Sequence, residues 1–184
     1  MKNRLFKIIV LFTIISFILG IIFYSIIGNN SKDIINNNIN LLIDNKLIKY
    51  KDIFINNIIT TSIIYILGIS IVGIILILPI YLFKVFILSF EFISLVVNLS
   101  LKNFIIIFLY LIPNVINLII YFIICYYSIN YSIFLIRNIF FNKKYNMFQI
   151  TKKYFFIYLI SLILIIISSL IELFVLPRLS YFKI

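Results

Sequence analysis

The chain has 184 residues, of which 65% are hydrophobic, and its mean hydropathy is +1.25. A soluble domain is only about 45–50% apolar, so this composition excludes an ordinary soluble protein and predicts one all-α transmembrane domain over residues 1–184. The net charge of +11 comes from basic residues in short gaps between apolar runs, a pattern that fits membrane topology and argues against nucleic-acid binding.

The first apolar run extends without a charge from Ile8 to Ile27. At 1.5 Å per residue it covers the roughly 30 Å of a hydrocarbon core. Lys2, Arg4 and Lys7 precede it. The run is too long for a signal peptide, and no small-residue cleavage site follows it. We therefore expect an uncleaved first span with the N-terminus in the cytoplasm.

The segment 29–57 is more polar, because Asn, Lys and Asp alternate with Ile and Leu. It is too polar to span, and the spacing of its apolar residues is roughly helical. We expect an amphipathic helix on the outer membrane surface, with a partly ordered loop as the alternative.

A second span is predicted from Ile58 to Phe83. Gly68, Ser70 and Gly73 lie in its middle, where small side chains would form a packing face against a neighbouring helix. Pro79, near its end, is expected to kink or end the helix.

The third run, Val85 to Leu99, is short and contains Glu91. It is either a short span or a re-entrant segment. Lys84 stands two helical turns before Glu91 on the same face, so its ammonium group is a candidate partner for the carboxylate.

The uncharged stretch from Phe104 to Leu135 predicts a fourth span, kinked at Pro113. We expect one helix over about 112–135, entered through an apolar segment from Phe104; two separate spans are the alternative. The basic residues that follow are Arg137, Lys143, Lys144, Lys152 and Lys153, with no acid among them.

The last predicted span runs from Phe155 to Leu176, with Glu172 near its end and Pro177 closing it. About five spans place the basic loop in the cytoplasm, in agreement with the positive-inside rule. The C-terminal tail then lies outside. We therefore expect a multi-pass protein of the cell membrane.

The residue content argues against catalysis. The chain has no His, so Ser-His-Asp triads and His-based zinc sites are excluded. It also has no Gly-rich phosphate loop, and its three Asp residues all lie in the segment 29–57. Cys125 lies in an apolar run and is expected to be a small buried residue. The sequence therefore predicts a protein that is not an enzyme and has no cofactor or metal.

Two carboxylates, Glu91 and Glu172, lie in predicted spans. Because a charge in mid-bilayer costs about 2.5–3.5 kcal/mol on insertion scales, each is a functional candidate. Structural pairing is one interpretation, and a transport or docking role is the other.

Four stretches resemble the stage II sporulation protein M family. The second span of the family resembles Tyr65–Phe86, with Gly68, Ser70, Gly73 and Lys84. Its Pro-bearing span resembles Leu111–Ile124, with Pro113 and Asn114, and the basic exit of that span resembles Leu135–Phe141, with Arg137. Its final Glu and Pro resemble those of Ile171–Pro177, with Glu172. The resemblance covers about residues 5–180. Wider members carry Pro-His-Gly and a later Glu, whereas here Asn114 and Val115 follow the proline and Leu118 stands at the acidic position, as in the sporulation branch.

This resemblance implies a non-catalytic scaffold that acts in engulfment during endospore formation. Its implied partners, besides the lipid bilayer, are the wall hydrolases stage II sporulation proteins D and P. The alternative is a permease or transporter component in which Pro79 and Pro113 break helices around Glu91. An inverted repeat would favour that alternative, but the segment 29–57 has no counterpart in the second half of the chain.

Overall fold

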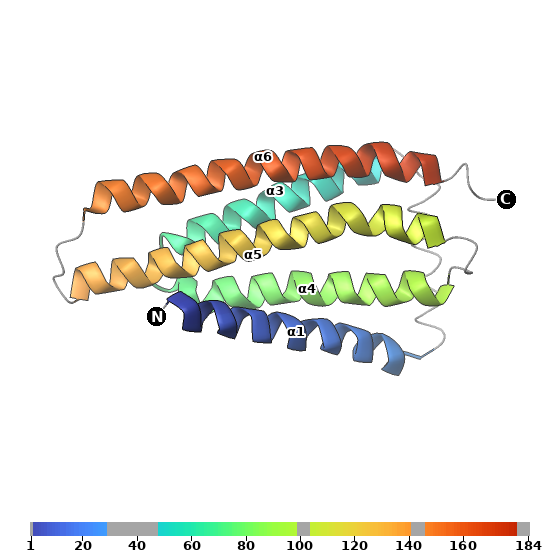
Figure 1. The fold of residues 1–184 in the computed structure, drawn as a ribbon, viewed down its shortest axis with the longest axis horizontal. Coiled ribbons are helices and arrows are strands. Elements are labelled where there is room, and N and C mark those ends of the chain that lie inside the picture. The colour runs from blue at the N-terminus through green and yellow to red at the C-terminus, as the bar shows by residue number, and fades with distance from the viewer. Residues whose placement is uncertain (1, 29–47, 99–103, 141–145, 180–184) are drawn as a thin grey trace.

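The computed structural model describes residues 2–28, 48–98, 104–140 and 146–179. Every regular element in these ranges is an α-helix, and successive helices run in alternating directions through one bundle (Figure 1). The helices are α1 (Lys2–Ile26), α3 (Ile48–Gly68), α4 (Gly73–Asn98), α5 (Phe104–Phe140) and α6 (Met147–Leu179). The predicted all-α bundle is confirmed.

Four of these helices are long and apolar enough to cross a membrane: α1, α4, α5 and α6. Helix α3 has a shorter apolar part, Phe54–Gly68. Large apolar side chains face outward along the spans, as at Ile75, which is 73% exposed. An α-helix satisfies the hydrogen-bonding groups of its own backbone, and an outward-facing apolar surface of this kind is expected to contact lipid.

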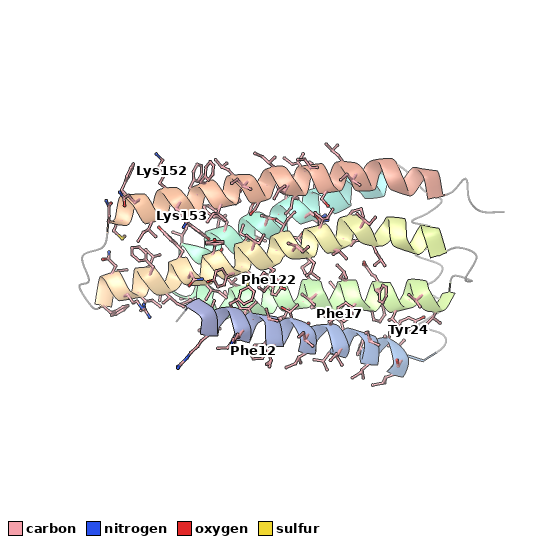
Figure 2. The ribbon with its side chains drawn as sticks, viewed as in Figure 1. Phe12, Phe17, Tyr24, Phe122, Lys152 and Lys153 are labelled. Atoms are coloured by element: carbon pink, nitrogen blue, oxygen red, sulfur yellow. The ribbon has the colours of Figure 1, made fainter. Side chains whose placement is uncertain are left out.

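Helix α5 is the central helix, since it packs against α6, α4, α3 and α1. Helix α1 packs mainly on α4, and Figure 2 shows Phe17 and Tyr24 on the side of α1 that faces that helix. The rings of Phe17 and Phe92 are 6.4 Å apart, and those of Tyr24 and Phe90 are 5.4 Å apart. These aromatic contacts fix the outermost helix to the bundle.

Buried hydroxyl groups join neighbouring helices through backbone carbonyls. Ser16 donates to Leu82 O at 2.7 Å, and Ser132 donates to Gly68 O at 2.7 Å. Ser168 donates to the carbonyl oxygen of the buried Pro113 at 3.0 Å. Small polar residues allow helices to approach closely, and an interhelical hydrogen bond in a membrane contributes about 0.6 kcal/mol on average.

The predicted span over 58–83 is wrong, because the chain turns between Gly68 and Gly73. Ser70 N donates to Leu67 O at 3.0 Å, and Gly73 N donates to Ser70 Oγ at 3.1 Å. These bonds close α3 and begin α4, so Ser70 and Gly73 form a turn and no packing face in mid-helix. Gly73 is required here, since a Cβ atom would overlap Leu67 O.

The predicted third segment, 85–99, is neither a short span nor re-entrant. Residues 85–98 continue α4, which passes through Pro79 without ending. Proline is tolerated in membrane helices because neighbouring groups satisfy the backbone that it leaves free. Helix α4 is about 39 Å long at 1.5 Å per residue, enough to cross the bilayer.

The prediction of one helix over about 112–135, rather than two spans, is confirmed, but the entry segment from Phe104 is also helical and α5 continues to Phe140 with Pro113 inside it. Helix α6 begins earlier than predicted and extends past Pro177 to Leu179, so that proline does not close it. Of the predicted surface segment, 29–47 lies outside the described residues. Residues 48–57 begin α3, and Asn57 is buried inside the bundle.

Candidate functional site

A polar cavity of about 180 Å³ lies between α3, α4 and α5. Each of the three helices contributes polar side chains to it. They are Asn56 and Asn57 from α3, Tyr81, Lys84 and Glu91 from α4, and Asn114, Asn117 and Tyr121 from α5. A group of this polarity inside an apolar bundle marks the cavity as the candidate functional site.

Helical spacing explains why these residues meet. Lys84 and Glu91 are seven residues apart on α4, and Asn114, Asn117 and Tyr121 follow one another by three and four residues on α5. Residues at such intervals share one helix face. Because α4 and α5 pack against each other, the two polar faces enclose one cavity.

Lys84 and Glu91 are the charged pair of the cavity. Both side chains are half-buried, and the charge of Glu91 acts on the ammonium group of Lys84. A charge alone in these surroundings would be costly, whereas two opposite charges reduce that cost for each other. The pairing of Lys84 with Glu91 stays a prediction, and the structure places both residues at one cavity.

Asn57 is held by hydrogen bonds at one side of the cavity. Tyr121 OH donates to Asn57 Oδ1 at 2.8 Å, and Thr61 Oγ1 donates to the Asn57 backbone oxygen at 2.8 Å. Asn117 is 4% exposed, and its Oδ1 has no hydrogen-bond partner within the described part of the chain. The cavity is polar and roomy enough for several water molecules.

The structure brings only some of the predicted site residues together. Lys84, Glu91 and Asn114 line the cavity, and Pro113 precedes Asn114 in the buried part of α5. The remaining candidates lie elsewhere: Gly68, Ser70 and Gly73 at the α3–α4 turn, Arg137 near the end of α5, and Glu172 and Pro177 in the last turns of α6.

The site residues Asn56, Asn57, Tyr81, Asn117 and Tyr121 were not predicted from the sequence. Asn117 stands in a predicted apolar span, although its spacing from Asn114 places both on one face. Asn56 and Asn57 stand where the polar segment meets the apolar part of α3. That boundary was interpreted as the edge of a surface segment.

The site can hold water or a small polar group and can bind a proton or cation at its one carboxylate. Among the described residues, no group of three His, Cys, Asp or Glu side chains is placed to hold a metal ion. Its chemistry is therefore that of one carboxylate, one ammonium group, amides and phenols.

This bundle defines a multi-pass membrane protein with a charged pair in its interior. The model of the stage II sporulation protein M family matches residues 9–177, and the chain belongs to that family. The match confirms the resemblance found in its sequence stretches and identifies a sporulation membrane protein. Comparisons with curated proteins and with solved structures found no match.

Proposed function

We propose that this protein is a non-catalytic membrane scaffold that positions peptidoglycan hydrolases during engulfment in endospore formation. The observation that carries the proposal is the family match, which covers nearly the whole bundle. The partners by resemblance are stage II sporulation proteins D and P. Because these hydrolases act on the wall, docking takes place at the outer end of the bundle.

Aromatic stacking between the helices supports a structural role. Tyr65 of α3 stacks on Tyr154 and Tyr158 of α6, with ring centroids 4.8 and 4.0 Å apart. Tyr131 of α5 stacks on Tyr154 at 4.3 Å. This tyrosine stack (Tyr65, Tyr131, Tyr154 and Tyr158) joins three helices and fixes their arrangement, as a scaffold requires.

The distribution of charge supports an orientation. Lys2, Arg4 and Lys7 lie at the end of the bundle where α5 ends and α6 begins, and Arg137 and Lys153 lie there too (Figure 1). We assign this basic end to the cytoplasm by the positive-inside rule. The C-terminal end of α6, with Glu172, then faces the outside.

Docking at the outer end predicts a loss of hydrolase recovery in a combined variant. The variant lacks 29–47 and 180–184 and carries Glu172→Gln, a set of changes that keeps Asn57 and the described part of α3. We expect at least about a ten-fold drop in co-purified hydrolase, the effect of losing roughly 1.4 kcal/mol of binding energy. Membrane-inserted protein should stay at the level of the unchanged chain.

The control is Lys152→Gln, which removes one charge at the basic end. It should leave hydrolase recovery unchanged. Full recovery with the combined variant, at equal membrane levels, would show that the hydrolases do not dock at the outer end.

A role as a transport component is the second candidate, and the cavity favours it because it places Glu91 in a polar space. In a transporter, Glu91→Gln would abolish sporulation while hydrolase recovery stays intact. In a scaffold, sporulation and hydrolase recovery fall or survive together across the variants. Scoring both quantities in each strain separates the two functions.

A further inference from the structure

A second and larger pocket, of about 550 Å³, opens between α1, α5 and α6 near the basic end. Its lining is aromatic and aliphatic, with one amide and two cationic side chains. The residues are Leu5 from α1, Tyr126, Tyr127, Asn130, Tyr131, Ile133, Phe134 and Arg137 from α5, and Ile150, Lys153, Tyr154 and Ile157 from α6. Neither the family match nor the proposed scaffold role uses this pocket.

The wall of the pocket is preformed. Tyr131 and Tyr154 are both buried, and their rings are stacked 4.3 Å apart at 9°. The Tyr131 hydroxyl is 2.8 Å from Thr151 Oγ1, and the Tyr154 hydroxyl donates to Tyr65 O at 2.8 Å. Because these hydroxyls are engaged within the protein, the two tyrosines offer the pocket mainly their apolar rings.

The charge of the pocket is positive. Arg137 and Lys153 are the charged residues of its lining, which contains no Asp or Glu. Figure 2 shows Lys153 on the side of α6 that faces α5, whereas the adjacent Lys152 points away from the bundle. A guanidinium group binds a phosphate through two parallel hydrogen bonds, and a lysine adds a flexible point charge.

We propose that this pocket binds an anionic phospholipid. The headgroup phosphate lies between Arg137 and Lys153, and the acyl chains follow the aliphatic side chains toward the bilayer. The pocket is flanked by α5 and α6, both apolar enough to span. A lipid therefore reaches it laterally, and the aromatic and aliphatic walls hold its apolar part.

The walls favour a lipid over a soluble phosphate. A free phosphate would use only the two cations and leave the apolar lining without a partner. Basic pockets between membrane helices near the cytoplasmic side are suited to acidic headgroups, and each nearby Lys or Arg contributes about 1 kcal/mol. The assignment of this end to the cytoplasm is not required, because anionic lipid can be supplied on either side in the test.

Native mass spectrometry of the full-length detergent-solubilised protein tests the proposal. Phosphatidylglycerol, phosphatidylcholine and inorganic phosphate are titrated separately. We expect phosphatidylglycerol to bind at least about ten-fold more tightly than phosphatidylcholine, and inorganic phosphate to compete only weakly. Arg137→Gln and Lys153→Gln should each weaken phosphatidylglycerol binding about five-fold, and the double variant about 25-fold.

Lys152→Gln is the matched control, since it removes the same charge from the neighbouring position outside the pocket. It should leave phosphatidylglycerol binding within about two-fold, because its side chain points away from the bundle and solvent screens its charge. Lys153 is exposed, so the Lys153→Gln variant keeps the fold and its result stands even if Arg137→Gln unfolds the protein. Equal losses for Lys152→Gln and Lys153→Gln, equal binding of the two lipids, or full displacement by inorganic phosphate would each overturn the proposal.

Discussion

Replacing Gly20 with Val is expected to separate α1 from α4 and to destabilise the protein by about 2–3 kcal/mol, the upper part of the range for an overpacked core. A Cβ atom at Gly20 would lie 2.6 Å from the Phe86 backbone oxygen and would overlap Ser89 Oγ. The hydroxyl of Ser89 can turn away, but the backbone of α4 cannot yield without moving the helix. Gly20→Ala should therefore have an effect in the same direction, though a smaller one.

Unfolding in mixed detergent micelles, followed by circular dichroism, measures this effect. Gly28→Val is the matched control, because a Cβ atom there would meet no atom within 4 Å. It should change the free energy of unfolding by less than about 0.5 kcal/mol. If the two valine variants unfold alike, α1 does not pack on α4 as described.

The second large effect is expected at the charged pair of the cavity. Lys84→Met or Glu91→Leu alone should destabilise the protein by about 2 kcal/mol, because each removes a charge that offsets the opposite one. This value is below the 3–5 kcal/mol range of fully buried pairs, since both side chains are half-buried. The double variant should cost less than the sum of the two single variants.

A double-mutant cycle measures the coupling, which we expect at about 1–2 kcal/mol. Lys152→Met is the reference for removing an exposed lysine. It should change the free energy of unfolding by less than about 0.5 kcal/mol. Additive effects of Lys84→Met and Glu91→Leu would mean that the two charges do not stabilise each other.

Composition and apolar runs were sufficient to predict an all-α bundle, because 65% apolar residues leave few alternatives to lipid. They did not locate the turn at 68–73. Ile69, Ile71 and Val72 keep this stretch as apolar as the helices on either side, so hydropathy carries no sign of the break. What marks the turn is local: the Gly73 amide donates a hydrogen bond to Ser70 Oγ, and a Cβ atom at Gly73 would overlap Leu67 O.

The error at the turn also produced the error over 85–99. Because the second span was predicted to continue to residue 83, the apolar run that remained, 85–99, was too short to cross the bilayer. The sequence predicted only some of the residues that line the cavity, and the reason is a different one. The spacing of Lys84 and Glu91 on one helix is visible in the sequence, whereas the approach of Asn57 to Tyr121 depends on how α3 packs against α5.

Labelling of a cysteine at position 72, in a Cys125→Ser background, tests the arrangement of the bundle most directly. Val72 is 62% exposed in the turn at the basic end, and Phe148, 76% exposed at the start of α6, marks the same side as a second cysteine position. We expect a membrane-impermeant maleimide to label both Val72→Cys and Phe148→Cys in permeabilised cells and neither in intact cells. A Val72→Cys protein that stays unlabelled in both preparations while Phe148→Cys reacts would place residue 72 inside the bilayer and contradict the turn and the bundle built on it.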